Sequence, residues 1–243
     1  GVVALIDVGR TEPPIRECLA ALGINNIDIL VLTHFDVDHA GGYGAVVGRV
    51  GTVLHGPPDG DADIAIIDEL RLGGARIVSA ERGLSGEIGR LHWRVLWPSD
   101  GNPRELGNPS SVTVLFERGA GCDVSCVTGL ALGDLPRAEQ TMLRLAGGLV
   151  PIDVVKVSHH GSRDQDPELY RRVRAPVALI GVGADNEYGH PTVDTLDVLA
   201  GVGSTVARSD LNGIVLVWRT LTGELRVWRE RATEPRFTLN TEE

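Results

Sequence analysis

The chain has 243 residues, 42% of them hydrophobic, so it can bury a substantial core, and we expect one domain over residues 1–243. Acidic residues outnumber basic ones 33 to 23, and the formal net charge of −10 argues against a large basic surface for nucleic acid. Phosphate chemistry is not excluded, because bound cations would cancel the charge of carboxylates that ligate them. No apolar run approaches the roughly 20 residues that cross a bilayer, and no basic leader opens the chain, so a soluble protein or fragment is expected.

The three cysteines, Cys18, Cys122 and Cys126, cannot form a complete set of disulfides because their number is odd. None of them has the Cys-x-x-Cys spacing of a zinc knuckle. They are expected to be buried thiols.

Short apolar, strand-like runs alternate with helix-like segments, which is typical of a layered α/β domain. In the first half, the expected order is a strand closed by residues 7–9, a helix over 14–22, strands over 29–33 and near 53–54, a helix over 63–72, and strands over 76–79, 92–96, 111–117 and 124–132. In the second half it is a helix over 137–146, a strand over 154–158, a helix over 167–173, a strand over 177–181, a helix over 193–200, and strands over 204–207, 214–218 and 225–229, the last two joined by a tight turn at 222–223. Two successive sets of strands and helices, one in each half of the chain, predict two sheets packed face to face and flanked by helices.

Four potential metal ligands fall within six residues, His34-Phe35-Asp36-Val37-Asp38-His39, directly after the apolar run at 29–33. Side chains at positions i, i+2, i+4 and i+5 cannot share one face of a helix or strand, so the segment is predicted to be a loop that folds around ions. The following Gly41-Gly42 pair lets the backbone turn closely over that site. One His and one Asp would indicate only an acidic surface turn, whereas four potential ligands within six residues indicate a metal site.

Further candidate ligands follow other predicted strands. The pair His159-His160 follows the strand at 154–158, Asp134 follows the apolar run ending at residue 132, and Asp7 closes the first strand. Loops at the carboxyl ends of strands gather functional side chains because the sheet holds them in register. Taken alone, Asp134 fits a helix N-cap, but a metal in the first loop makes it a ligand candidate.

Seven short segments carry these residues and their neighbours: Ile6-Asp7-Val8-Gly9, Thr33 to Gly42, Asn108-Pro109-Ser110-Ser111, Gly133-Asp134-Leu135-Pro136, Lys156 to Ser162, Asn186 to Pro191, and Ser209-Asp210-Leu211-Asn212-Gly213. In this order they resemble the metallo-β-lactamase superfamily, and within it the C-terminal hydrolase domain of ComEC-type DNA-uptake competence proteins. The resemblance implies an αββα sandwich with a two-metal site along one sheet edge. The amino-terminal hairpin of that family, which would precede Asp7, is expected to be missing.

The resemblance also implies a role for each candidate ligand. His34 and Asp36 resemble ligands of a first metal ion. A second ion would take Asp38, His39 and either His159 or His160, and Asp134 would bridge the two ions. Asp7 resembles a carboxylate that orients the histidine-containing loop.

Two departures from the broader superfamily change the expected metal. Asp36 stands where a second histidine is usual, and Asn108 and Ser111 occupy the region of a third-motif histidine that is absent here. Both departures are associated with the ComEC-like branch. Carboxylate and hydroxyl oxygens are harder ligands than imidazole nitrogen. The first site is therefore expected to favour Mn²⁺, with Zn²⁺ or Mg²⁺ as alternatives.

The implied activity is hydrolysis by a water that two metal ions activate, with phosphorus as the target. Asp38 is placed both to ligate and to accept a proton, and His190 is a candidate leaving-group acid, or else a structural histidine that fixes the following helix. The only lysine, Lys156, is a candidate substrate contact, or else a strand residue that faces solvent or a carboxylate. Candidate donors to substrate or to loop backbone are Asn108, Ser111 and Ser162.

The leading hypothesis is a metal-dependent nuclease or phosphodiesterase that degrades a DNA strand during uptake, with single-stranded DNA as its substrate. A stand-alone relative could instead hydrolyse a small phosphodiester, ester or lactone. A third alternative is a domain that binds DNA or a partner without turnover, which the intact ligand set and the acidic charge disfavour. An excised domain would be extracytoplasmic or tethered to the membrane beside its parent's channel segment, whereas a stand-alone enzyme would be cytoplasmic.

Overall fold

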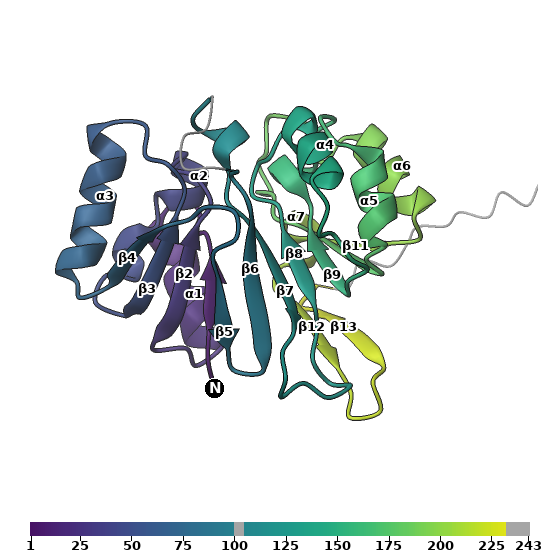
Figure 1. Cartoon of the computed structure of the whole chain (residues 1–243), viewed down its shortest axis with the longest axis horizontal. Helices are drawn as coiled ribbons and strands as arrows, with labels where there is room; N and C mark the ends of the chain where they lie inside the picture. Colours follow the sequence, from purple (N-terminus) through teal and green to yellow (C-terminus); the bar gives the residue numbers. More distant parts are fainter. Residues whose placement is uncertain (100–104, 232–243) are drawn as a thin grey trace, which may run out of the picture.

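The computed structural model describes residues 1–99 and 105–231, whose strands form two main sheets and a separate hairpin (Figure 1). The first sheet is parallel throughout and has the order β1-β2-β3-β4. Its strands are β1 (Ala4–Ile6), β2 (Ile27–Leu32), β3 (Val50–His55) and β4 (Arg76–Ser79). Helices α1 (Glu12–Ala21) and α3 (Asp61–Leu72) connect strands of this sheet, as parallel pairing requires.

The second sheet is mixed and has the order β11-β10-β9-β8-β7-β6-β5. Its antiparallel part contains β5 (Ser85–Ile88), β6 (Leu91–Trp97), β7 (Thr113–Arg118) and β8 (Gly129–Ala131). The strands β9 (Val154–Lys156), β10 (Val177–Ile180) and β11 (Thr205–Arg208) continue from β8 in parallel, through helices α4 (Arg137–Leu145), α5 (Pro167–Val173) and α6 (Val193–Gly201). In residues 1–99 and 105–231, no helix has both the length and the apolar character needed to span a bilayer.

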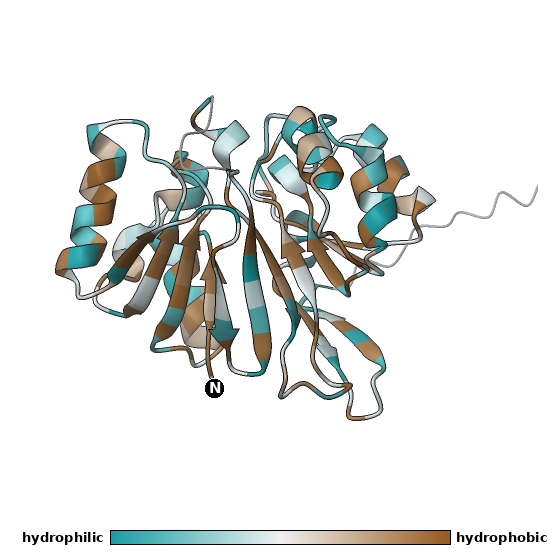
Figure 2. Ribbon diagram, viewed as in Figure 1, coloured by the Kyte–Doolittle hydropathy of each residue, from teal (hydrophilic) through white to brown (hydrophobic). Residues whose placement is uncertain are grey.

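Three apolar clusters define the layers of the molecule. One fills the space between the sheets and includes Val31, Leu54, Val95, Val112 and Val114. A second packs α1 and α3 on the first sheet, and a third packs α4, α5 and α6 on the second sheet. Within β2, Val31 joins the cluster between the sheets whereas Leu30 and Leu32 join the helix-side cluster, so both faces of this strand are buried. Hydrophobic residues accordingly colour most of the central strands in Figure 2, and the αββα sandwich predicted from the sequence is confirmed.

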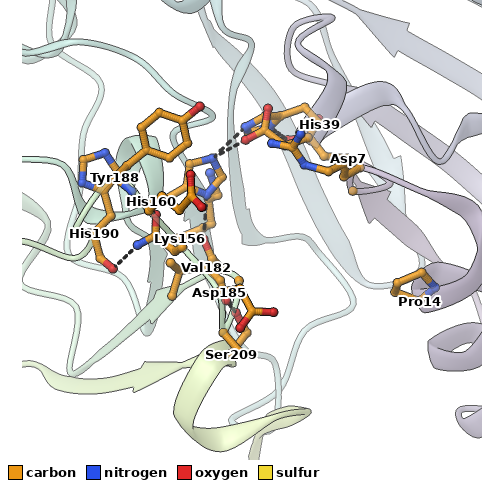
Figure 3. Close-up of a pocket in the computed structure, with 18 of the residues that line it drawn as sticks. Asp7, Pro14, His39, Lys156, His160, Val182, Asp185, Tyr188, His190 and Ser209 are labelled. Carbon is orange, nitrogen blue, oxygen red and sulfur yellow. Dashed lines mark hydrogen bonds and ion pairs between the residues drawn. The ribbon is translucent and has the colours of Figure 1, made fainter.

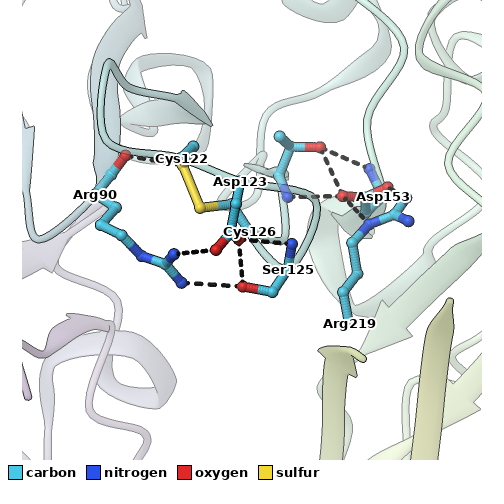
Figure 4. Close-up of a disulfide and its surroundings, with 8 residues drawn as sticks. Arg90, Cys122, Asp123, Ser125, Cys126, Asp153 and Arg219 are labelled. Atoms are coloured by element: carbon cyan, nitrogen blue, oxygen red, sulfur yellow. Dashed lines mark hydrogen bonds and ion pairs between the residues drawn. A yellow bond between two sulfur atoms is a disulfide. The ribbon is translucent and has the colours of Figure 1, made fainter. Parts of the chain in front are cut away.

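The cysteines are not three buried thiols, so that expectation is wrong. Cys122 and Cys126 form a disulfide with a Cα–Cα distance of 5.8 Å (Figure 4). Cys18 is a half-buried thiol in α1. A turn between the bonded cysteines brings the two Cα atoms within disulfide range, since Asp123 accepts hydrogen bonds from the backbone and hydroxyl of Ser125 at 2.8 and 2.5 Å. The strand expected from residue 124 therefore begins only at β8.

The hairpin of β12 (Val215–Arg219) and β13 (Leu225–Arg229) has a five-residue connection instead of the expected tight two-residue turn. It is joined to the main body by Arg219, whose Nε donates to Asp153 Oδ2 at 3.1 Å. The Asp153 side chain is 10% exposed. Burial raises the pKa of this carboxyl, but the hydrogen-bonded Arg219 guanidinium and Thr128 lower it by more, so the net pKa lies below its usual value.

A carboxyl whose pKa falls on folding stabilises the native state above its unfolded-state pKa, and this contribution is lost as pH falls through the folded-state pKa. Asp153→Asn is therefore expected to lower the free energy of unfolding by about 1 to 3 kcal/mol at pH 7 and by clearly less at pH 3. Urea denaturation at both pH values measures the difference. The control is Glu224→Gln, which removes the exposed Glu224–Arg226 pair of the same hairpin and should cost under about 0.5 kcal/mol. An equal loss for Asp153→Asn at both pH values would contradict this assignment.

Candidate metal centre

The candidate ligands meet at one edge of the sandwich, where β2, β8 and β9 end. His34 and Asp36 follow β2, and Asp38 and His39 lie in the one-turn helix α2 (Val37–Ala40), so the segment is not wholly the loop expected from its sequence. Asp134 follows β8, and the histidine pair lies in a short 3-10 segment, Ser158–Gly161, after β9. The carboxyl ends of strands from both sheets therefore supply the cluster.

Three histidines are oriented by hydrogen bonds from the same ring nitrogen. Nδ1 lies 2.8 Å from an Asp7 oxygen in His39, 2.6 Å from the Gly181 carbonyl in His160, and 3.1 Å from the Thr33 hydroxyl in His34. The carboxylate and carbonyl partners fix Nδ1 of His39 and His160 as the protonated nitrogen, which leaves Nε2 free as a ligand atom. All three Nε2 atoms take part in the cluster described next.

The ligand atoms of the cluster lie close together around Asp134. His39 Nε2 is 3.2 Å from Asp134 Oδ1, and His160 Nε2 is 3.3 Å from Asp134 Oδ2. Asp38 Oδ2 is 3.2 Å from His160 Nε2. Two groups have all their ligand atoms within 4.8 Å of one another, namely His34, His39 and Asp134, and Asp38, His39 and His160.

This geometry fits bound cations. The Nε2 atoms of His39 and His160 face each other at 3.2 Å, and two imidazole lone pairs at that distance repel unless a proton or a metal ion lies between them. His34 Nε2 is buried and has no hydrogen-bond partner among the described residues. Buried polar atoms are normally satisfied, so an unpartnered nitrogen aimed at carboxylates suits a missing ligand. The mixed imidazole and carboxylate donors suit Mn²⁺ or Zn²⁺.

The charges of the metal-free cluster are strongly coupled. Burial raises the pKa of Asp134, but the Lys156 ammonium and hydrogen bonds from His160 and His39 lower it by more, so the net pKa lies well below its usual range. Burial lowers the pKa of His39 and of His160, yet hydrogen bonds to Asp134 and a second carboxylate raise each to about 9. Without a metal ion, protons on the two imidazoles thus balance the charge of Asp134, and a bound cation would take the place of those protons.

Two predicted ligands lie at the margin of the cluster. Asp36 Oδ2 is 3.5 Å from His34 Nε2, but its side chain is 59% exposed. His159 Nε2 is 3.9 Å from Asp134 Oδ2, farther than His160, and its side chain is 35% exposed. Of the two adjacent histidines, the structure therefore brings His160 into the tight group of ligand atoms.

Asp7 lies under the cluster and contacts the ring of His39. Its carboxylate accepts hydrogen bonds from the Thr33 backbone at 2.8 Å and the Thr33 hydroxyl at 2.9 Å, as well as contacting His39. Its φ of 57° is a left-handed conformation that costs energy for a residue with a side chain. Such strain is retained where the position of the carboxylate is needed.

Replacing Asp7 with Asn is expected to weaken Mn²⁺ binding by roughly 10- to 100-fold, because the ring of His39 loses its charged orienting partner. Competition of a fluorescent chelator for Mn²⁺ measures this affinity. Asp197→Asn, at an exposed position of α6, is the matched control and should leave the affinity unchanged. An Asp7→Asn protein that binds Mn²⁺ as tightly as the wild type would show that this carboxylate does not orient a ligand.

The predicted substrate contacts have different surroundings. Lys156 Nζ donates to the Gly133 carbonyl at 2.9 Å and lies 3.4 Å from Asp134, so it faces a carboxylate. Ser111 Oγ accepts from the Asp134 backbone at 3.1 Å and lies 3.4 Å from His34 Nδ1. Ser162 is buried and its hydroxyl accepts from a loop amide, whereas Asn108 Oδ1 is buried without a partner among the described residues.

A cleft of about 800 Å³ opens over the cluster (Figure 3). Asp7, Asp38 and His39 line one side, and His190 lines the other with neighbours from residues 181–188. Arg10 and Tyr188 also line the cleft, and Thr33 supports the ligands from below. No role was predicted for any of these three residues. Thr33 and Tyr188 lie inside the sequence motifs and Arg10 follows one of them. The sequence carries no other indication of their position, because no residue spacing reveals which side chains face a cleft.

Residues 1–65 match the Metallo-beta-lactamase superfamily. The diiron β-hydroxylase CmlA from Streptomyces venezuelae superposes with a TM-score of 0.55 over 84% of this chain and 45% of its own, at 18% identity, which shows a shared fold. The chain therefore has the metallo-β-lactamase fold.

The curated relatives of the chain are competence proteins of the ComEC type. ComE operon protein 3 of Bacillus subtilis (strain 168) is 30% identical over 203 residues, which are 81% of this chain and 25% of that protein. Competence protein ComA of Neisseria gonorrhoeae is 28% identical over 214 residues, which are 85% of this chain and 27% of that protein. The chain thus spans about a quarter of the length of these relatives.

Proposed function

We propose that this chain is a metal-dependent phosphodiesterase that cuts single-stranded DNA, and that it degrades a strand during DNA uptake. The observation that carries the proposal is the group of imidazole and carboxylate atoms around Asp134, with the Nε2 atoms of His39 and His160 facing each other at 3.2 Å. Its relation to competence proteins supports DNA as the substrate. The superfamily fold supports hydrolysis as the reaction class.

The ligands of two divalent cations would come from the whole cluster: His34, Asp36, Asp38, His39, Asp134 and His160. Cations in such a site, with Mn²⁺ favoured over Zn²⁺ and Mg²⁺, supply polarisation of a phosphoryl group and activation of water. Asp134 belongs to the group with His34 and His39 and lies 3.3 Å from His160 of the other group, so it would be a ligand available to either ion. Lys156 holds Asp134 in place and offsets part of the carboxylate charge.

Two side chains are placed to move protons. The hydrogen bond from His160 holds the pKa of Asp38 well below its usual range, so its carboxylate is ionised and can accept a hydrogen bond from an attacking water. His190 lines the opposite wall of the cleft and its pKa is lowered by burial and by nearby imidazoles. A histidine there can donate a hydrogen bond or a proton to the leaving oxygen of the cut strand.

The first test is cleavage of end-labelled single-stranded DNA by metal-stripped protein resupplied with Mn²⁺, Mg²⁺ or Zn²⁺. Cleavage that depends on the added metal and is strongest with Mn²⁺ is expected. If the metals bind but no DNA is cut, the nuclease assignment fails, and parallel assays with a small phosphodiester, an ester and a lactone then test the alternative hydrolases. DNA binding without any turnover would instead favour a non-catalytic domain.

The location we propose is extracytoplasmic, beside the membrane channel segment of a longer parent protein. The chain corresponds to about a quarter of its competence relatives, which leaves room for such a segment. The Cys122–Cys126 disulfide supports this placement, because disulfides persist in oxidising compartments and are rare in the cytosol. Reaction of intact cells with a thiol reagent that cannot cross membranes, before and after reduction, would test it.

A further inference from the structure

One wall of the cleft presents a tyrosine ring to solvent. Tyr188 lies in the loop between β10 and α6 and is 80% exposed, the most of any aromatic side chain in the described part of the chain. The ring also lines the cleft that contains Asp38, His39 and His160 (Figure 3). An exposed aromatic ring beside a reaction centre is a surface on which a flat ligand can stack.

The ring continues a row of rings that leads away from the metal ligands. His159 and His160 have centroids 6.2 Å apart, His159 and His190 have centroids 5.7 Å apart, and both pairs meet edge to face. Tyr188 stacks on His190 at 6.2 Å with an angle of 21° between the planes. The tyrosine ring thus lies roughly parallel to the ring of His190, and it is three side chains from the cluster.

Hydrogen bonds hold this turn in shape. Asn186 Oδ1 accepts from the Tyr188 amide at 3.0 Å, and Asn186 Nδ2 donates to the His190 carbonyl at 2.6 Å. Gly189, between the two rings, has a φ of 70°, a left-handed conformation that few other residues adopt without strain. These contacts hold the backbone on either side of Tyr188 in one conformation, which lowers the entropy cost of stacking a ligand on its ring.

The charges of the loop decide which part of a nucleotide it suits. Tyr188 follows Asp185 and Glu187, and both acidic residues line the cleft. Their carboxylates repel phosphate, so a strand held at the metal site turns its phosphates away from this loop. A nucleobase carries no charge, and stacking on an aromatic ring accepts any base.

We propose that Tyr188 forms a nucleobase subsite, on which the base next to the cut phosphodiester stacks. This inference rests on the proposed function, because it places a nucleic acid strand in the cleft. The tyrosine acts here through its ring face and not through its hydroxyl. Cutting should therefore depend little on sequence but strongly on the presence of a base.

The test measures binding and cleavage of two single-stranded oligonucleotides, one with normal bases and one with abasic residues at its central positions. Binding is measured by fluorescence anisotropy in EDTA, so that no strand is cut, and again with Ca²⁺. The proteins are the wild type, Tyr188→Phe, Tyr188→Ala and, as a control for loss of an exposed aromatic outside the cleft, Trp218→Ala. A 2-aminopurine probe at the central position reports stacking by its quenching.

The wild type, Tyr188→Phe and Trp218→Ala are expected to prefer the normal strand and to quench 2-aminopurine. Tyr188→Ala should bind the normal strand roughly 5- to 100-fold more weakly, raise its KM for that strand by a similar factor, and bind the abasic strand unchanged. Three results would overturn the subsite. They are loss of binding in Tyr188→Phe, equal binding of both strands by the wild type, and no binding of either strand by the wild type. If Tyr188→Ala loses the preference for the normal strand but the wild type cuts no DNA with any of the metals, the subsite is retained and the phosphodiesterase assignment is rejected.

Discussion

Asp38→Ala is expected to lower Mn²⁺-dependent cleavage of single-stranded DNA by roughly 10²- to 10⁴-fold, the range associated with loss of a positioned acid or base. The carboxylate lies 3.2 Å from His160 Nε2 and belongs to a group of three ligand atoms with His39 and His160. Its removal would take away both a proposed metal ligand and the proposed proton acceptor. Initial rates at saturating DNA, over a series of Mn²⁺ concentrations, separate these two effects.

The fold should tolerate this change, because the Asp38 side chain is 37% exposed and lies at the surface of the cleft. Asp197→Ala, an exposed position on α6, is the control for removing one negative charge. Thermal unfolding of both variants in EDTA should match that of the wild type. If Asp38→Ala cuts DNA at the wild-type rate with Mn²⁺ saturating, the reaction does not use this cluster.

His160→Ala is expected to reduce Mn²⁺ affinity and DNA cleavage at least about 100-fold, whereas His159→Ala should change each by less than about 10-fold. The reason is geometric, since His160 Nε2 is within 3.3 Å of both Asp38 and Asp134, and His159 Nε2 comes no closer to Asp134 than 3.9 Å. Equilibrium dialysis with Mn²⁺ measures the affinity, and the same cleavage assay measures the rate.

The two histidines are natural controls for each other. Both have left-handed backbone conformations, with φ of 46° at His159 and 51° at His160, so alanine brings similar backbone strain at either position. A difference between the variants therefore reflects the ring and not the backbone. Equal losses, or a larger loss for His159→Ala, would mean that the ligand is not the histidine assigned here.

Much of the fold could be predicted from local patterns in the sequence. The alternation of apolar runs and helical segments placed nearly every strand and helix, because hydrophobic periodicity and helix boundaries depend on neighbouring residues. The edge strand β5 was missed, since Ser85-Gly86-Glu87-Ile88 has no apolar run and pairs only because β6 lies beside it. The disulfide was also missed, because cysteine number alone does not say which thiols a turn brings together.

The candidate site, like the fold, could be predicted only in part. The sequence by itself determined the types of the candidate ligands, four of them within residues 34–39, and a hard or borderline divalent metal is the group that these types suit. Only the tertiary structure decided that His160 lies nearer to Asp38 and Asp134 than His159, that Asp7 orients His39, and that Tyr188 lines the same cleft. The contact between His39 and His160, which are 121 positions apart, also joins residues that follow strands of different sheets. Residue type is a local property of the chain, whereas such distances exist only after the two sheets have packed together.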